Sequence, residues 1–201
     1  LVCAAGQAEP AHYQIDPIHS RVALAVEHAG FSHSMAILSV QSGHLLWDAG
    51  NPADARVDVV LDLKRLDFGD ADWNRAVLGR ALLDVQRHPQ ARFHSSQVQV
   101  LADGQLRIDG ELELRGVRAP VSLLARHNDQ RRHPMPPFQQ TVGFSATATL
   151  SRAAFGADAW ANMVGDTVAL RIELEAARSR GGERPASPAE PADADAAVPA
   201  R

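Results

Sequence analysis

The sequence predicts an all-β protein, an antiparallel β-barrel with a short helical insertion across one end. Three observations favour this fold class. Apolar and polar residues alternate with period two in six segments, which is typical of strands that bury one face. Short turn-forming stretches separate these segments, and one longer segment shows helical spacing instead. A β-sandwich has the same alternation and is the alternative architecture.

The first clear strand, residues 21–28, places Val22, Leu24, Val26 and His28 on one face. Four later segments repeat this apolar face with Val57, Val59, Leu61 and Leu63, then Leu106, Ile108, Leu112 and Leu114, then Val142, Phe144, Ala146 and Ala148, and finally Val168, Leu170, Ile172 and Leu174. Residues 119–127 supply a further strand. In a closed barrel, these inward residues would line one interior.

Turn signals divide the strands at AGFSH, QSG, DAGNPAD, ADG, RGVRAP and HPMPPF. The exception to the alternation is residues 69–90, where Trp73, Val77 and Leu78 recur near helical spacing and Pro89 ends the segment. We expect one helix or two short ones here, inserted between strands and lying across one end of the barrel.

Composition narrows the function. The length of 201 residues indicates one domain. The formal net charge of −4 gives no sign of the basic face that nucleic-acid binding usually needs. The sequence contains no phosphate-binding loop, dinucleotide fingerprint, HExxH motif or GxSxG elbow. We expect no cofactor. Cys3 is the only cysteine, which excludes an internal disulfide and a multi-cysteine zinc site.

The chain divides into three parts. Residues 1–10 are typical of an export-signal remnant, with a cleavage point after Ala8, although Cys3 is alternatively a lipidation site. Residues 11–177 form the folded domain. Residues 178–201 are rich in proline, alanine and acid with almost no large apolar residue, so we expect a disordered tail. The expected location is the bacterial periplasm.

Histidines are the remaining candidates for chemistry. His19 and His28 lie nine residues apart in IDPIHSRVALAVEH, roughly 30 Å along a strand, so they cannot share a metal ion. His28, His33 and His44 are the residues of an alternative reading, a metal- or haem-associated redox protein. Otherwise His28 is either a hydrogen-bonded residue at the end of an apolar face or the polar anchor of a bound ligand.

The chain also carries YQIDPIHSRVALAVEHAGFS, HPQARFHSSQV, GQLRIDGELELRGVRAPVSL, GFSATATLSRAAFG and VGDTVALRIELEA, in an order and spacing that resemble the YceI-like family over about residues 13–176. Positions shared with that family are His19, Ser20, His28, Gly30, Pro89, Phe93, Gly110, Gly116, Pro120, Phe155 and Gly156. The resemblance implies a lipocalin-like barrel that holds a long apolar molecule.

The resemblance further implies an exported, non-enzymatic protein that binds, stores or transports polyisoprenoid or quinone-like lipids. Several family members adjoin membrane cytochromes of the b561 type, so such a cytochrome is an expected partner, and a homodimer is compatible with the sequence. Many members carry a charged Arg-Asp-x-His-Leu-Arg run where this chain has residues 73–78, WNRAVL. This difference favours a quinone or another neutral head group over a pyrophosphate.

The expected ligand-contacting residues lie on the inner strand faces and in the two least regular segments, where Trp73 and Trp160 serve either as packing residues or as ligand contacts. They are Val22, Leu24, Val26, His28, Phe31, Trp73, Leu78, Ile108, Leu112, Phe144, Trp160, Leu170 and Ile172. No catalytic and no metal-binding residue is expected. A third reading, a β-domain with a solid interior that serves only for interaction, requires a barrel with no cavity.

Overall fold

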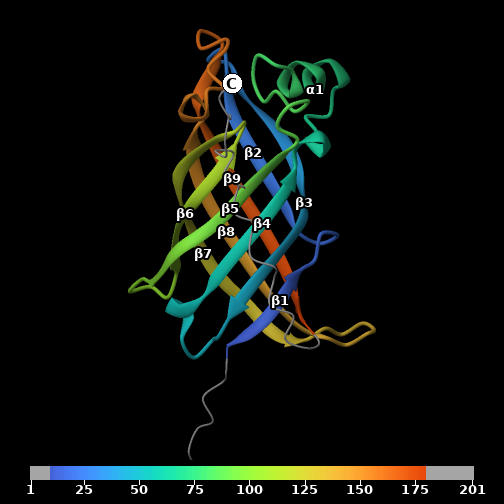
Figure 1. Cartoon of the computed structure of the whole chain (residues 1–201), viewed down its shortest axis with the longest axis vertical. Helices are drawn as coiled ribbons and strands as arrows, with labels where there is room; N and C mark the ends of the chain where they lie inside the picture. Colours follow the sequence, from blue (N-terminus) through green and yellow to red (C-terminus); the bar gives the residue numbers. More distant parts are fainter. Residues whose placement is uncertain (1–9, 180–201) are drawn as a thin grey trace, which may run out of the picture.

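The computed structural model describes residues 10–179, which form a single antiparallel β-barrel (Figure 1). The predicted export-signal remnant and disordered tail lie outside the described residues, apart from Pro10, Arg178 and Ser179. The strands are β1 (Ala11–Ile15), β2 (Arg21–His28), β3 (Ser32–Trp47), β4 (Arg56–Asp62), β5 (Gln90–Val100), β6 (Leu106–Leu114), β7 (Val117–Arg132), β8 (Gln140–Ser151) and β9 (Val164–Arg178). The barrel prediction is confirmed, and the sandwich alternative is wrong.

Eight strands close the barrel. Strands β2 to β9 pair around the circle, with β4 against β3 and β9 against β2 as the closing contacts. Strand β1 pairs with the second half of β3 and with the end of β9. Like β2, it therefore lies between β3 and β9, and the two short strands follow one another along the same position in the barrel wall. All these pairings are antiparallel, and closure of the sheet into a barrel removes the exposed edges that an open sheet would leave.

The break between β1 and β2 is a hydrogen-bonded turn. The Asp16 carboxylate accepts from the Ile18 amide at 2.7 Å and lies 2.7 Å from the His19 ring nitrogen Nδ1. Ser20 is fully buried, and its hydroxyl accepts from the Glu175 amide at 3.1 Å and donates to the Glu175 carbonyl at 3.2 Å. His19 therefore stabilises the start of β2 and is far from His28 at its other end.

Strand β3 corrects one predicted turn. The QSG stretch lies inside this strand, at a register shift between Val40 and Ser42. Gly43 is required there because a Cβ atom at this position would lie 2.6 Å from the Asp58 carbonyl oxygen and 2.6 Å from Ile15 Cδ1. A glycine within a strand often indicates a bulge or a close backbone approach instead of a turn.

The predicted helical segment contains one helix, α1 (Ala71–Leu78). The Asp70 side chain caps it by accepting from the Asp72 and Trp73 amides at 3.0 Å each. Turns follow from Gly79 until β5 begins. Figure 1 shows α1 at the end of the barrel opposite β1, as expected. Among residues 10–179, no helix has the length and apolar character needed to cross a bilayer.

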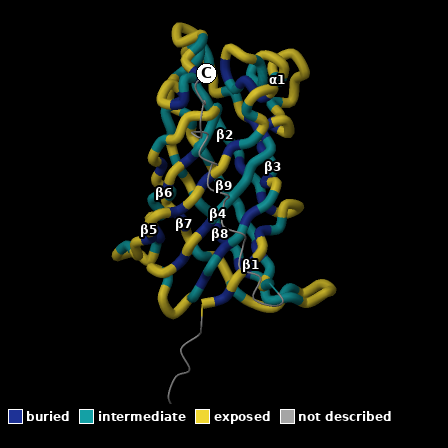
Figure 2. The backbone as a smooth tube through the Cα atoms, in the orientation of Figure 1, coloured by how far each residue is buried: buried dark blue, intermediate teal, exposed yellow. Residues whose placement is uncertain are grey.

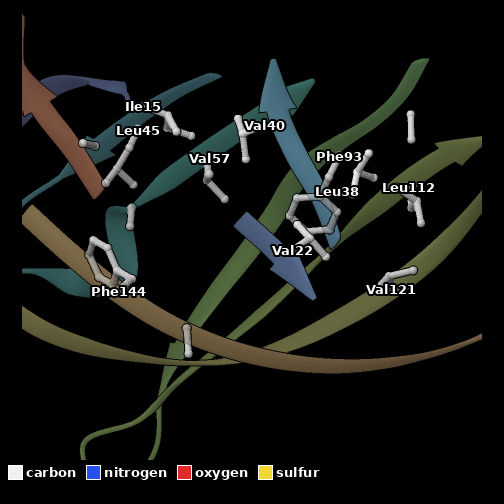
Figure 3. Packing of buried hydrophobic residues seen from close by; sticks show 14 of the residues in the cluster. Ile15, Val22, Leu38, Val40, Leu45, Val57, Phe93, Leu112, Val121 and Phe144 are labelled. Carbon is white, nitrogen blue, oxygen red and sulfur yellow. The ribbon is translucent and has the colours of Figure 1, made fainter. Parts of the chain in front are cut away.

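The core follows the inward faces of the strands. Figure 2 shows buried and exposed residues alternating along them, and Figure 3 shows buried side chains of several strands around one interior. Four of the most completely buried apolar residues lie where β1, β8 and β9 meet: Tyr13 and Ile15 are 1% exposed, and Val142 and Ala176 are 0% exposed. This end of the barrel, the far end, is therefore closed by packed side chains.

Candidate ligand-binding cavity

A cavity of about 540 Å³ lies inside the barrel and is lined by residues of strands β2 to β9 and of α1. Strand β9 contributes lining residues from Val164 to Leu174, which corresponds to roughly 25 Å along the barrel axis at the usual strand rise and tilt. The interior is therefore hollow over much of its length, which counts against the reading of a solid, purely interacting β-domain.

Eleven of the expected residues line this cavity. They are Val22, Leu24, Val26, His28, Trp73, Ile108, Leu112, Phe144, Trp160, Leu170 and Ile172. The alternation that placed the strand residues on inner faces thus brings them together from β2, β6, β8 and β9. That they contact a ligand stays a prediction.

Phe31 and Leu78 do not line the cavity, which corrects the expected set. Phe31 follows Ala29 and Gly30, both with positive φ, in the β2–β3 turn, and its side chain is 91% exposed. On α1, the face toward the cavity holds Trp73, Ala76 and Val77. Leu78 is one residue further, about 100° around the helix, and packs against the core instead.

The wall of the cavity is almost entirely apolar. Besides the tryptophans, the lining residues with a polar or charged side chain are Glu27, His28, Ser34, Arg56 and Arg152. Four of these belong to the end of the barrel where β2 ends, β9 begins and α1 lies, which we call the mouth. Such a distribution suits a ligand with a long apolar body and one polar end.

Arg152 is a residue that the sequence analysis missed. The residue is buried, at 8% exposure, and its guanidinium donates to the carbonyls of Gly165 at 2.9 Å, Ala159 at 2.8 Å, Val164 at 2.7 Å and, at short range, Ala157. These bonds hold the loop between β8 and β9 against the mouth. The signal in the sequence was an arginine beside a glycine-containing turn, which alone does not distinguish a surface charge from a buried one.

Aromatic contacts join α1 to the barrel at the mouth. The His28 ring lies 5.4 Å from the Trp73 ring, measured between centroids, and the Phe68 ring meets Trp73 edge-on at 6.2 Å. Trp73 is 43% exposed, so it faces both the cavity and solvent. His28 is therefore one of the polar groups at the mouth and also packs against Trp73 of the helix.

The far end combines aromatic packing with a short hydrogen-bonded chain. Trp47 meets Phe144 edge-on at 4.9 Å and His127 at 5.1 Å. The Trp47 indole donates to Gln130, and the Gln130 amide donates to the Tyr13 hydroxyl, each at 3.0 Å. Burial raises the pKa of Tyr13, although the positive charge of Arg178 acts in the opposite direction. Tyr13 thus stays a neutral hydroxyl within this series of hydrogen bonds.

The alternative metal or haem site is not supported. Within the part of the chain that the structure describes, no group of three or more His, Cys, Asp or Glu residues is placed to hold a metal ion. His33 pairs across the sheet with Glu27, and His44 pairs with Asp58. His33 and His44 lie eleven residues apart on β3, roughly 36 Å at the usual strand rise, so they cannot join His28 in one site.

Comparison with known proteins agrees with this barrel. The model of the YceI-like domain matches residues 13–176, almost the whole described range. The chain belongs to the YceI-like family. A UPF0312 protein of Pseudomonas putida is 30% identical over 155 residues, covering 76% of this chain and 80% of that protein.

Two solved structures share the YceI-like fold. Burkholderia cenocepacia BcnA superposes with a TM-score of 0.70 at 20% identity and covers 80% of this chain and 98% of its own. A domain of Saccharophagus degradans, described as a polyisoprenoid binding domain implicated in plant cell wall breakdown, has a TM-score of 0.56 at 12% identity over 85% of this chain and 100% of its own. At these identities the likeness establishes the fold.

Proposed function

We propose that this chain binds a long-chain isoprenoid or quinone-like lipid in the barrel cavity, and that it stores or transports the lipid without catalysing a reaction. The observation that carries this proposal is the apolar cavity of about 540 Å³ whose polar groups gather at one end. A similar barrel described as polyisoprenoid-binding supports the same class of ligand. The alternating strand faces supply the wall for an apolar chain.

We infer that the head group lies at the mouth and that it is neutral. His28 can donate a hydrogen bond to a quinone carbonyl, while the carboxylate of Glu27 would repel a phosphate. The charge of Arg152 is already engaged by four backbone carbonyls. Among the lining residues at the mouth, Glu27 and Arg152 together contribute no net charge, which favours a neutral head over a pyrophosphate.

Exchange with a membrane explains how such a carrier can both load and release. Burial of a forty-carbon chain from water would nominally gain some 30 kcal/mol, at about 0.8 kcal/mol per carbon, which exceeds known non-covalent affinities. The lipid starts in a bilayer, however, where its chain is already removed from water. Transfer between bilayer and cavity is therefore close to neutral, and neither direction is strongly opposed.

The cellular setting belongs to the same proposal. A periplasmic location would place the carrier next to a membrane that contains quinones, and a membrane cytochrome of the b561 type is the proposed partner for delivery. The activity requires no cofactor, because binding and release involve no bond change.

Tryptophan fluorescence tests the proposal. The sequence has three tryptophans, and Trp47, Trp73 and Trp160 all line the cavity. Titration with a long-chain ubiquinone should quench their emission in a saturable manner, and the isoprenoid alcohol solanesol should reverse the quenching by competition. Folded protein that shows no saturable quenching, or quenching that solanesol does not reverse, would overturn the proposal.

A further inference from the structure

Large apolar side chains are exposed around the mouth of the barrel. Phe31 is 91% exposed, Trp73 43%, Trp160 47% and Met163 48%. They come from the β2–β3 turn, from α1 and from the loop before β9, which Figure 1 shows at one end of the barrel. We call these four residues the mouth rim. Exposed apolar residues that gather in this way commonly indicate an interaction surface.

Hydrogen bonds and ring contacts join the three segments of the mouth rim. The Ala29 amide donates to the Met163 carbonyl at 2.6 Å, and the Met163 amide donates to the Trp160 carbonyl at 2.8 Å. His28, just before this turn, places its ring 5.4 Å from Trp73. The rim residues are therefore carried by adjoining backbone segments, although they lie far apart in the sequence.

The loop that carries Trp160 and Met163 is held in place. Trp160 has a positive φ of 57°, which is unusual for a bulky residue and needs support from its surroundings. Arg152 supplies that support, because its guanidinium binds the carbonyls of Ala157 and Ala159 before Trp160 and of Val164 after it. The half-exposed indole is thus a fixed feature of the mouth.

The mouth rim continues the apolar wall of the cavity. Trp73, Trp160 and Met163 line the cavity and are also exposed to solvent, whereas Phe31 is exposed without lining it. An apolar surface therefore extends from the interior to the outside at this end. A lipid that follows it would remain in contact with apolar side chains throughout its passage.

We propose that the mouth rim is a membrane-docking surface that inserts into the outer part of a bilayer, so that lipid passes between bilayer and cavity without crossing water. This inference rests on the proposed function, because docking would serve to load and release the bound lipid. Aromatic residues with one polar atom suit the boundary between head groups and acyl chains.

The charged residues near the mouth rim indicate which kind of bilayer it would bind. The three rim segments, residues 28–34, 71–78 and 156–164, contain Asp72, Arg75 and Asp158 as their only Asp, Glu, Lys or Arg residues. Asp72 and Arg75 pair with each other at 2.5 Å. Without an excess of basic residues the rim has no electrostatic preference for anionic lipid. Docking therefore occurs on zwitterionic bilayers and depends little on salt.

The far end of the barrel provides a matched control. The β7–β8 hairpin exposes Met135 at 65% and Phe138 at 51%, but neither residue lines the cavity. If exposed apolar side chains alone caused adsorption to membranes, this hairpin would contribute as much as the mouth rim. The proposal instead assigns docking to the mouth.

The test measures flotation of the full chain with phosphatidylcholine vesicles that contain no isoprenoid. We expect the unmodified protein to float with the vesicles, F31S to lower the partition coefficient about tenfold or more, and M135S/F138S to leave it unchanged. Phe31 is a surface turn residue, so F31S should keep the native thermal transition and the ubiquinone quenching. Lipids brominated near the head group should quench emission of the bound protein, and W73F/W160F, which retains Trp47 at the far end, should escape this quenching.

The outcomes separate docking from cargo binding. Absence of flotation by folded protein, equal loss in M135S/F138S, or a requirement for anionic lipid that salt abolishes would each overturn the docking surface, even if ubiquinone binds. Flotation that F31S selectively weakens supports docking even if ubiquinone fails to bind, and in that case only the proposed cargo falls.

Discussion

Ala146 is the position at which the cavity can be filled most directly. It lies on β8 opposite Ala125 and Ile172, lines the cavity and has a side chain of one carbon. The substitution A146W would project an indole across the interior between neighbouring strands. Since the space there is not filled by protein atoms, we expect the barrel to accept the ring at a cost no greater than the ~1–3 kcal/mol typical of overpacking.

The effect on binding follows from the carbons that the ring displaces. If the indole excludes about five carbons of the lipid chain, the lost burial amounts to ~4 kcal/mol at about 0.8 kcal/mol per carbon. That corresponds to a decrease in affinity of about 1000-fold, because each 1.4 kcal/mol is tenfold. Movement of the chain within the cavity would reduce this figure, so a loss of at least tenfold is the expected minimum.

The assay is equilibrium competition, in which solanesol displaces bound ubiquinone, with thermal unfolding to confirm the fold. The matched control is T147W, which adds the same ring to the same strand, but on the exposed outer face. We expect T147W to bind as the unmodified protein does. Folded A146W with unchanged affinity would refute the reasoning, because the lipid could not then occupy the cavity.

Three further predictions concern the mouth and the β1–β2 turn. H28L should weaken ubiquinone binding about fivefold through loss of one hydrogen bond of ~1 kcal/mol, and H28Q should restore most of it; equal affinity of the two variants in the quenching titration would refute a polar role. R152L should lower the free energy of unfolding in urea by at least ~3 kcal/mol, because four carbonyls lose a charged donor; a loss below ~1 kcal/mol would contradict the loop-holding role. Burial raises the Asp16 pKa, but hydrogen bonds from His19 and the Ile18 amide outweigh it and hold that pKa below its ordinary value, while the same bond raises the pKa of His19. The pair therefore stabilises the fold above the lowered Asp16 pKa and below the raised His19 pKa, so the melting-temperature difference between the unmodified protein and H19A should shrink at both acidic and alkaline pH; a difference that is constant with pH would rule this out. The contribution of the Asp16–His19 pair to the free energy of unfolding should stay below ~1 kcal/mol, because the pair is partly exposed.

Alternation was sufficient to predict most of the barrel interior. In β2, β6 and β9 the inward residues follow from period two alone, and the structure places them around one cavity. The helix α1 was equally readable, because an aspartate cap and helical spacing both lie within residues 69–90. These features are local, so a single segment of sequence contains the information.

The features that sequence reading missed depend on distant contacts. The QSG stretch has the composition of a turn, and only the close approach of Gly43 to Asp58 and Ile15 explains why this stretch belongs inside β3. Strand β1 is five residues long, too short to show a period, and its place depends on pairing with β3 and β9. Both assignments require knowledge of the neighbouring strands.

The same limit applies at the candidate site. Arg152 is indistinguishable in sequence from the other arginines, because its burial depends on carbonyls presented by the β8–β9 loop and by the start of β9. Phe31 was included among the expected ligand-contacting residues, but two positive φ angles before it turn the chain outward. Side-chain direction in a turn depends on backbone conformation, which the residue pattern does not report.

Mass spectrometry of an organic extract tests the central claim most directly, with protein purified from its own host and not exposed to added lipid. The account predicts one dominant long-chain isoprenoid with a neutral head, near one molecule per chain, and its depletion in A146W but not in T147W. Folded protein recovered in full with no isoprenoid in the extract would contradict the claim that the cavity holds this class of lipid, and an extract that contained prenyl pyrophosphates instead would contradict the neutral head.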